Sequence, residues 1–389
     1  MKKTHLITLV VLATITLFTS CIQEEAPNTE CDIVSVDTTH SWFITNEKIL
    51  TGDFSIENNA VTFFIEKTAD FKAIGINHES IIDAFILTSG AKIEKYSGND
   101  DEKKEIKIDH NGILLYYTVS SEDGIWSKEY SIKFIKMLPL DIDHLFGFEN
   151  FTTQKFTTWS EINKDGITNN IWASGNAGFS MSGLGKSPED YPTSTFEDGV
   201  TGNCVKLTTR STGKFGKMMK MPIAAGNIFI GEFQSANATK APLEATRFGL
   251  PIAPGRPVSL TGYYKYTPGE VFTDKAMNEI EGRVDTCSIY SVLYEIDPNN
   301  FEPLNGGNVL SSDRIVLVAE LENPSEPTEW TQFKIPYKEF GGKTFDYKKL
   351  ESGEYAITVV ASSSKDGAYF EGAVGSTLYI DEIKINWEN

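Results

Sequence analysis

The chain has 389 residues, of which 12% are aromatic, and a formal net charge of −19 at pH 7. A surface this acidic repels nucleic acid and anionic lipid headgroups, and no basic stripe in the sequence offsets it, so we expect no nucleic-acid partner. The length is sufficient for two or three domains with ample hydrophobic core.

The first residues have the pattern of an export signal. Met1-Lys2-Lys3 is basic, and the apolar run from Leu6 to Phe18 would span roughly 20 Å as a helix, short of the ~30 Å hydrocarbon core of a bilayer. This pattern predicts a cleaved signal peptide over residues 1–20. The boundary Phe18-Thr19-Ser20-Cys21 resembles the lipobox of bacterial lipoproteins. The resemblance implies that Cys21 becomes the acylated N-terminus and anchors the protein in the outer membrane.

Residues 21–32 are polar and acidic, which predicts a tether with nothing to bury. Within them, Gln23-Glu24-Glu25 resembles the acidic tag that directs lipoproteins of one Gram-negative phylum to the cell surface. We therefore expect the anchored protein to face the cell exterior.

Residues 33–138 alternate short strand-like runs with turns. Val61 to Ile65, Ile113 to Val119 and Tyr130 to Ile135 are rich in β-branched and aromatic residues. This spacing predicts an immunoglobulin-like β-sandwich. The segment Tyr117 to Tyr130 resembles the last hairpin of small immunoglobulin-like modules near the start of many bacterial surface lipoproteins, which implies a spacer role.

Residues 145–389 are again strand-like, with long loops containing Gly, Pro and Asn between the strands. One large β-sandwich of jelly-roll type fits this pattern better than two small domains. The fold class predicted for the whole chain is therefore all-β, with an N-terminal immunoglobulin-like sandwich followed by a larger jelly roll.

Three cysteines remain once Cys21 carries lipid. Cys31, Cys204 and Cys287 are an odd number, so at most one disulfide forms. Cys204 and Cys287 both lie in strand-like runs, where buried free thiols are favoured over a bridge between them.

The five histidines all precede residue 145, so the predicted jelly roll lacks the imidazole of a Ser-His-Asp triad, a Cys-His dyad or a histidine zinc site. Carboxylates remain for acid-base chemistry, and glycoside hydrolysis needs only two of them. The candidate acids lie beside aromatic residues, and any catalytic pair has to come from different loops. They are Asp274, Asp285, Glu295, Asp366 and Glu371.

Aromatic side chains near loops are candidates for stacking on sugar rings, because sugars present apolar C–H faces and polar rims. In Tyr263-Tyr264-Lys265-Tyr266, alternation sends Tyr264 and Tyr266 to one face of the strand and Tyr263 and Lys265 to the other. Core packing is the alternative for each aromatic, and solvated surface charge for each acid. The predicted carbohydrate-binding residues are Trp172, Tyr264, Tyr266, Tyr290, Trp330 and Tyr369, with Asp285 and Asp366 as polar partners.

Asp381 stands in a run whose strict alternation places it on the face of Tyr379, Ile383, Ile385 and Trp387. A buried carboxylate there needs a cation or several hydrogen bonds. β-Sandwich carbohydrate-binding modules often hold a structural Ca²⁺ between such an Asp and a Glu near the first strand, and Glu149 is the matching Glu. One structural Ca²⁺ on Glu149 and Asp381 is therefore predicted, with an Asp held by backbone N–H groups as an equal alternative.

Several segments occur together in one order, and they are Gly147–Asn150, Trp172–Gly178, Ile223–Gly231, Gly262–Gly269, Asp285–Tyr294, Asp366–Ala373 and Gly375–Asp381. On these segments, residues from about 145 to 389 resemble the putative carbohydrate metabolism domain of bacterial lipoproteins, a family sometimes described as glycoside hydrolases. The resemblance implies a jelly-roll sandwich behind an immunoglobulin-like domain and transfers no catalytic residue.

The leading interpretation is a cell-surface lipoprotein that binds glycans for carbohydrate utilisation, beside neighbouring glycan-uptake proteins. A glycoside hydrolase that uses two loop carboxylates is the first alternative. A structural or adhesive surface component is the second, and a jelly-roll face without exposed aromatics would favour it.

Overall fold

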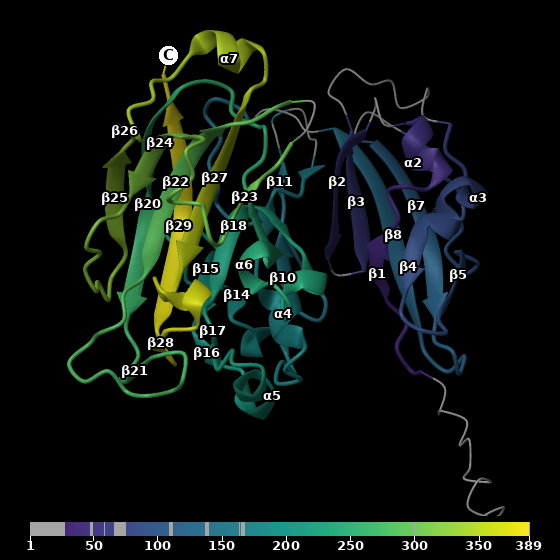
Figure 1. The fold of residues 1–389 in the computed structure, drawn as a ribbon, viewed down its shortest axis with the longest axis horizontal. Coiled ribbons are helices and arrows are strands. Elements are labelled where there is room, and N and C mark those ends of the chain that lie inside the picture. Colours follow the sequence, from purple (N-terminus) through teal and green to yellow (C-terminus); the bar gives the residue numbers. More distant parts are fainter. Residues whose placement is uncertain are drawn as a thin grey trace, which may run out of the picture.

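The structure is a computed structural model that describes residues 28–46, 50–57, 59–65, 75–108, 112–136, 140–162, 164, 168–298 and 301–388. The predicted signal peptide and Cys21 lie outside the described residues. Figure 1 shows an N-terminal body and a larger body that ends with the C-terminus, both built mainly of strands. Within the described residues, no helix is both long and apolar enough to cross a membrane.

The N-terminal body is built on one six-stranded sheet in the order β2-β3-β8-β7-β5, with β6 also paired to β7. Strands β3 and β8 pair in parallel, whereas the other pairs are antiparallel. The short sheet β1-β4 and helices α2 and α3 supply side chains to the same core. The elements are β1 (Ile33–Val36), α2 (Ser41–Thr45), β2 (Leu50–Glu57), β3 (Ala60–Ile65), α3 (His78–Ile81), β4 (Phe85–Leu87), β5 (Lys92–Lys95), β6 (Lys107–Ile108), β7 (Gly112–Ser120) and β8 (Ser127–Lys136).

The larger body contains two main sheets. An eight-stranded sheet runs in the order β23-β19-β18-β27-β22-β24-β26, with β13 paired to β18, and a five-stranded sheet runs β14-β15-β29-β20-β25. The first sheet contains β13 (Trp172–Ala173), β18 (Asn227–Phe233), β19 (Thr246–Phe248), β22 (Ser288–Glu295), β23 (Leu304–Asn305), β24 (Ile315–Glu320), β26 (Lys338–Glu339) and β27 (Tyr355–Ser362). The second contains β14 (Thr193–Phe196), β15 (Cys204–Thr208), β20 (Pro257–Thr267), β25 (Thr331–Pro336) and β29 (Thr377–Trp387).

Short strand pairs and helices join and cover these sheets. The pairs are β9 (Phe151–Thr153) with β10 (Thr157–Trp159), β11 (Glu161–Ile162) with β12 (Thr168–Asn169), β16 (Arg210–Ser211) with β17 (Ile223–Ala224), and β21 (Phe272–Thr273) with β28 (Gly372–Ala373). The helices are α4 (Asn176–Ser180), α5 (Gly213–Met218), α6 (Pro242–Ala245) and α7 (Tyr347–Glu351). The predicted all-β sandwich class is confirmed, while the immunoglobulin-like topology of the N-terminal body stays a prediction.

The main core lies between the two large sheets. Along β22, Ile289 and Leu293 point into this core, whereas Tyr290, Val292 and Tyr294 point to the opposite face of the sheet. Side chains of a strand alternate between the two faces, and seven of the eight β22 residues are buried, so both faces of the eight-stranded sheet are covered. The outer cover includes α6 and parts of the α4 and α5 region (Figure 1).

A β-bulge in β29 corrects one sequence prediction. Glu382 has a positive φ of 48°, and the pairing of β29 with β20 shifts register at this point. The extra residue reverses the alternation beyond it, so Ile383 and Ile385 share the inner face with Ile380. Asp381 therefore does not share a face with Ile383, Ile385 and Trp387, as strict alternation predicted.

Candidate functional site

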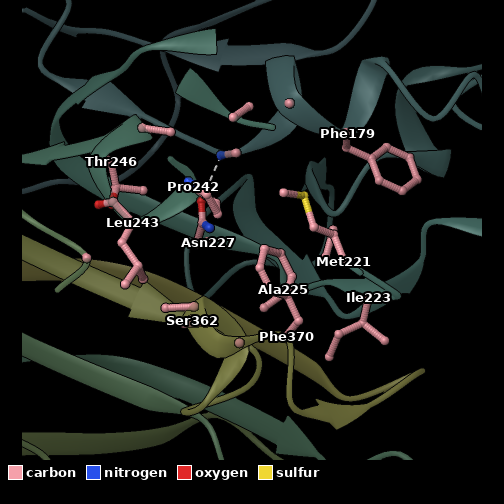
Figure 2. A pocket seen from close by; sticks show the side chains of 18 of the residues that line it. Phe179, Met221, Ile223, Ala225, Asn227, Pro242, Leu243, Thr246, Ser362 and Phe370 are labelled. Carbon is pink, nitrogen blue, oxygen red and sulfur yellow. Dashed lines mark hydrogen bonds between the residues drawn. The ribbon is translucent and has the colours of Figure 1, made fainter. Parts of the chain in front are cut away.

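An apolar cavity of about 220 Å³ lies on the outer face of the eight-stranded sheet. Its floor is formed by the sheet, including Phe229, Tyr290 and Val360, and its walls come from α4, α5, β17 and α6. Figure 2 shows Phe179, Met221, Leu243 and Phe370 around this space. We refer to it below as the apolar cavity.

A second, more polar space adjoins the apolar cavity and is called the polar cleft below. Its volume is about 630 Å³, and Glu244, Lys275, Tyr369 and Glu371 supply its polar groups. Tyr369 is 54% exposed, so its ring is available to a ligand. The two spaces have four lining residues in common, which are Pro242, Leu243, Ala368 and Phe370.

The segment 366–371 lies where the two spaces meet, because its residues Ala368 and Phe370 line both. Gly367 begins a short 3-10 turn and packs so closely that a Cβ atom there would lie 2.4 Å from the Cβ of Ala225. Phe370 follows in the left-handed region, with φ 63° and ψ 31°, a conformation that costs a non-glycine residue roughly 1–3 kcal/mol. The Lys275 ammonium lies 5.1 Å from the centre of the Phe370 ring. The surrounding packing thus holds Phe370 between the cavity and the cleft.

Most polar side chains that line the apolar cavity are already bonded within the protein. Asn227 Oδ1 accepts from Gly175 N at 2.8 Å, and Thr212 Oγ1 donates to the Met221 carbonyl at 2.5 Å. Ser362 Oγ donates to the Ser364 carbonyl at 2.9 Å, and Lys365 Nζ lies 3.4 Å from Glu320 Oε1. No carboxylate is among the cavity's lining residues. The chemical character of the space is therefore set by aromatic, aliphatic and thioether groups.

Tyr264 and Tyr266, predicted to stack on sugars, belong to the core between the sheets. They are 3% and 1% exposed; the Tyr264 hydroxyl shares a hydrogen bond with Ser325 Oγ, and the Tyr266 hydroxyl donates to the Ser363 carbonyl. The prediction selected the wrong face of β20, because Tyr263 and Lys265 are the residues on the less buried face. No direct sugar contact is available to Tyr264 or Tyr266.

Trp172 is also a core residue, with 4% exposure, and its Nε1 donates to Glu161 Oε1 at 2.7 Å. The other oxygen of Glu161 lies 2.9 Å from His144 Nε2, and the His144 ring packs edge-on against Phe146. His144 therefore packs into the larger body, which thus contains one imidazole, although no histidine follows residue 144. These contacts assign Trp172 to packing rather than to ligand binding.

The other two predicted aromatics differ in position. Tyr290 lines the apolar cavity but is only 7% exposed, and burial raises the pKa of its hydroxyl above the ordinary value. Trp330 packs on Lys265, whose ammonium lies 4.6 Å from the indole, and Trp330 Nε1 donates to the Asp198 carbonyl at 3.1 Å. Tyr290 thus lines the apolar cavity and Tyr369 the polar cleft, whereas Trp330 lines neither.

The predicted polar partners have structural contacts. Asp285 is 1% exposed, and its Oδ2 accepts from Ser364 Oγ, Ser376 Oγ and Ala373 N at 2.6, 2.7 and 2.8 Å. Burial raises the pKa of its carboxyl more than these donors lower it. Asp366 is partly exposed and forms an ion pair with Arg283 at 2.7 Å. The prediction that Asp285 contacts a sugar is wrong, because its carboxylate faces the protein interior.

Of the three remaining candidate acids, two are also held by contacts within the protein. Glu295 is bonded to Lys343 and Lys349, and Asp274 accepts from Ala276 N and Asn278 N within its own turn. Glu371 alone among the five predicted acids lines the polar cleft.

Glu149 and Asp381 hold the same loop through hydrogen bonds. Glu149 accepts from the backbone N and the side-chain Nδ2 of Asn203 at 2.9 and 2.8 Å. Asp381 is fully buried and accepts from Val200 N at 2.7 Å and Thr201 N at 3.3 Å, while burial raises the pKa of its carboxyl to about 6. This is the N–H-held geometry that the sequence left as the alternative to calcium.

No group of three or more His, Cys, Asp or Glu side chains able to hold a metal ion occurs in the described part of the chain. The N–H donors that face Asp381 and Glu149 occupy oxygens that a calcium ion would need. Calcium binding by Glu149 and Asp381 stays a prediction, and the function proposed for the protein does not require it.

The three described cysteines are free and buried, as predicted for Cys204 and Cys287. Burial raises the pKa of both thiols to about 12, so they remain protonated and unreactive at neutral pH.

Sequence reasoning missed two features. Glu244 and Lys275 reach the polar cleft from α6 and from the loop after β21, and neither stands in an aromatic-rich run that would have indicated a site. The outer face of the five-stranded sheet carries a cross-strand row in which the Lys206 and Lys265 ammonium groups lie 5.7 and 5.2 Å from the Tyr379 ring. Alternation within β20 predicted the face that carries Lys265. That Lys206 and Tyr379 lie beside it follows only from the order of the strands in the sheet.

A crystal structure of a putative glycoside hydrolase from Bacteroides thetaiotaomicron is similar to this chain, with 37% identity and a TM-score of 0.74 over 94% of this chain and 99% of that chain. A second putative glycoside hydrolase structure, from Bacteroides vulgatus, has 37% identity and a TM-score of 0.58 over 64% of this chain and 98% of that chain. No curated protein matches the chain at a significant level.

Residues 147–386 match the family described as "Putative carbohydrate metabolism domain", more than half of the chain. This match confirms the family resemblance inferred from the sequence and supports a carbohydrate-related role. The chain belongs to the "Putative carbohydrate metabolism domain" family.

Proposed function

We propose that this protein binds glycans at the polar cleft. The observation that carries the proposal is the exposed ring of Tyr369 beside Glu244, Lys275 and Glu371 in one space of about 630 Å³. A flat ring suits the C–H face of a sugar, and carboxylates and an ammonium group suit its hydroxyls. The volume is ample for more than one sugar ring.

The proposal includes a lipid anchor at the cell surface. Its basis is the sequence alone: the apolar run that ends before Cys21 and the acidic residues that follow it. The anchored protein would hold the polar cleft outside the cell, where polymeric glycans are available. Mass spectrometry of the mature N-terminal peptide checks this point, and an unmodified Cys21 would contradict it.

Replacing Tyr369 with alanine is expected to weaken glycan binding about tenfold, because the loss of one stacked ring costs on the order of 1.4 kcal/mol. Binding is measured on a glycan array with the soluble chain that starts after Cys21, and then by calorimetry on the best ligand. Tyr347→Ala is the matched control, since Tyr347 is 53% exposed but lies on α7 and lines neither space. Equal affinities of the Tyr369→Ala variant and the wild type would remove Tyr369 from the site.

A glycoside hydrolase is the second candidate, favoured by one observation. Glu244 on α6 and Glu371 in the loop before β28 line the same cleft, which supplies two carboxylates from different segments. Hydrolases use such a pair at 5–5.5 Å for retention or 6.5–9.5 Å for inversion of configuration. The two similar crystal structures, both described as putative glycoside hydrolases, also support this candidate.

If the chain cleaves a bound glycan, Glu244→Gln and Glu371→Gln are each expected to lower kcat by about 10²–10⁴-fold while ligand binding persists. Products are followed by chromatography after incubation with each glycan that binds. Glu351→Gln on α7 serves as the control, because Glu351 is exposed and lines neither space. Full activity in both cleft variants would exclude this pair as the catalytic residues.

A further inference from the structure

We propose that the ligand of this protein is an amphiphilic glycoside, whose sugar occupies the polar cleft and whose apolar aglycone occupies the apolar cavity. The inference rests on the glycan binding proposed above and specifies the chemical class of the ligand. The aglycone is an aryl group or a short alkyl chain joined to the sugar.

The size and walls of the apolar cavity define the aglycone. A cavity of 150 Å³ lined by aliphatic and aromatic groups is known to accept benzene, so about 220 Å³ accommodates a substituted aromatic ring or a short alkyl chain. Phe179, Met219, Met221 and Phe370 are among its lining residues. Methionine side chains adapt to the shape of an apolar guest and contact aromatic rings favourably.

A sugar ring does not suit the apolar cavity. Its hydroxyls would need hydrogen-bond partners, and burying an unpaired hydroxyl costs roughly 1–3 kcal/mol on the scale of protein variants. The polar side chains Asn227, Thr212 and Ser362 are already bonded to backbone groups, and the Lys365 ammonium lies beside Glu320. Burial of apolar groups, by contrast, is favourable at about 25 cal/mol per Å².

The adjoining cleft has the opposite chemistry. It carries two carboxylates, an ammonium group and a phenol on Glu244, Glu371, Lys275 and Tyr369, none of which lines the apolar cavity, where no carboxylate occurs. Because Pro242, Leu243, Ala368 and Phe370 line both spaces, the two spaces meet at these residues, and a molecule that lies over them contacts both. A ligand with a polar and an apolar half uses the whole surface, whereas a plain oligosaccharide uses only the cleft.

Phe370 lies where the apolar cavity and the polar cleft meet. Its left-handed backbone places the ring in the wall of the cavity, and Figure 2 shows the ring directed into that space. Strained backbone conformations persist at sites where the surrounding structure imposes them. Lys275, which contacts the ring, belongs to the cleft. The ring therefore contacts the aglycone near its bond to the sugar.

Calorimetry with three matched series tests the inference: methyl, phenyl and n-hexyl β-glycosides of glucose, galactose and mannose. For the sugar that binds, the phenyl or hexyl glycoside is expected to bind at least tenfold more tightly than the methyl glycoside. A gain confined to the phenyl series identifies an aryl aglycone, and a gain in the hexyl series identifies an alkyl chain. Free phenol and hexanol are measured in parallel.

Met221→Trp is designed to fill the apolar cavity, since Met221 is only half-buried and its side chain lines the space. This variant is expected to lose the phenyl or hexyl gain and to retain the affinity for the methyl glycoside. Met181→Trp is the matched control, because Met181 is 41% exposed and lines neither space. Thermal unfolding confirms that each variant folds, and Ala224→Leu, at another half-buried lining position, replaces Met221→Trp if that variant does not fold.

The outcomes separate this inference from the proposed function. Equal affinity for methyl, phenyl and hexyl glycosides overturns the amphiphilic ligand and leaves glycan binding intact. Binding of free phenol or hexanol without any gain in the glycosides also overturns it, because the two spaces then act independently. If Met221→Trp still binds the phenyl or hexyl glycoside more tightly than the methyl glycoside, the aglycone binds outside the apolar cavity and the inference is overturned. If no glycoside of any series binds and the array is silent, the proposed function itself fails.

Discussion

Asp285→Ala is expected to destabilise the larger body by about 3–5 kcal/mol, the cost of leaving buried donors without their charged acceptor. The Asp285 carboxylate accepts from Ser364 Oγ, Ser376 Oγ and Ala373 N, all within 2.8 Å. Without it, the Ser376 hydroxyl and the Ala373 N–H lose this acceptor, while the Ser364 hydroxyl retains only the neutral Thr209 Oγ1. The measurement is the free energy of unfolding from urea titrations followed by circular dichroism.

Asp366→Ala is the matched control for that experiment. Both acids were predicted from the sequence to contact sugar, but Asp366 forms its ion pair with Arg283 at the surface, with 36% of its side chain exposed. Surface ion pairs contribute about 0–1 kcal/mol, so the control variant should unfold close to the wild type. Similar losses in the two variants would contradict the assignment of Asp285 as a buried structural acceptor.

The stability contributed by Asp381 is expected to fall by about 2 kcal/mol between pH 4 and pH 7. Its folded pKa of about 6 lies above the unfolded value near 3.9, so the folded state holds the proton more tightly. The contribution is complete below about pH 4 and is lost as the pH rises through 6. The cause is burial of the carboxylate under the loop that contains Val200 and Thr201, which outweighs the hydrogen bonds from their N–H groups.

Asp381→Asn removes this titration and isolates its effect. The difference in unfolding free energy between the wild type and the variant should shift by about 2 kcal/mol in favour of the variant from pH 4 to pH 7. Other titrating groups cancel in that difference. Asp313→Asn, at an exposed position, is the matched control variant. A difference that stays constant with pH would show that Asp381 ionises as readily in the folded protein as in the unfolded chain.

The strand pattern of this fold was predictable because side-chain alternation and β-branched runs are local signals. Val61 to Ile65 and Tyr130 to Ile135 fall within β3 and β8, and the run Thr377 to Trp387 coincides with β29. What local signals could not supply was the face of each strand that becomes core. In β20, alternation separated Tyr264 and Tyr266 from Tyr263 and Lys265 but did not show which face is core, and the choice of Tyr264 and Tyr266 as the exposed pair was wrong.

The reversal of side-chain alternation within β29 also could not be predicted from local signals. A bulge adds one residue without changing the residue types of a strand, and Glu382 gives no sign in the sequence that its φ is positive. The environment of Asp381 therefore depends on pairing with β20 and on the loop that covers it, both distant in sequence.

The polar cleft was only partly predictable. Tyr369 and Glu371 stand together in an aromatic-rich loop, which is why the sequence indicated them. Glu244 and Lys275 join them from segments that are far away along the chain, and neither has a local pattern typical of a site. The apolar cavity was not predictable at all, since it depends on how α4, α5 and α6 sit above the eight-stranded sheet.

That covering layer has a consequence for how such a protein can change over evolutionary time. The core between the two sheets is built mainly from strand residues, whereas the walls of the two spaces proposed to bind ligand come from short helices and connections on the far side of one sheet. Insertions or exchanges in those connections can reshape the binding surface while the sandwich beneath stays intact. A single scaffold of this design can therefore acquire new ligand preferences by changing only its outer segments.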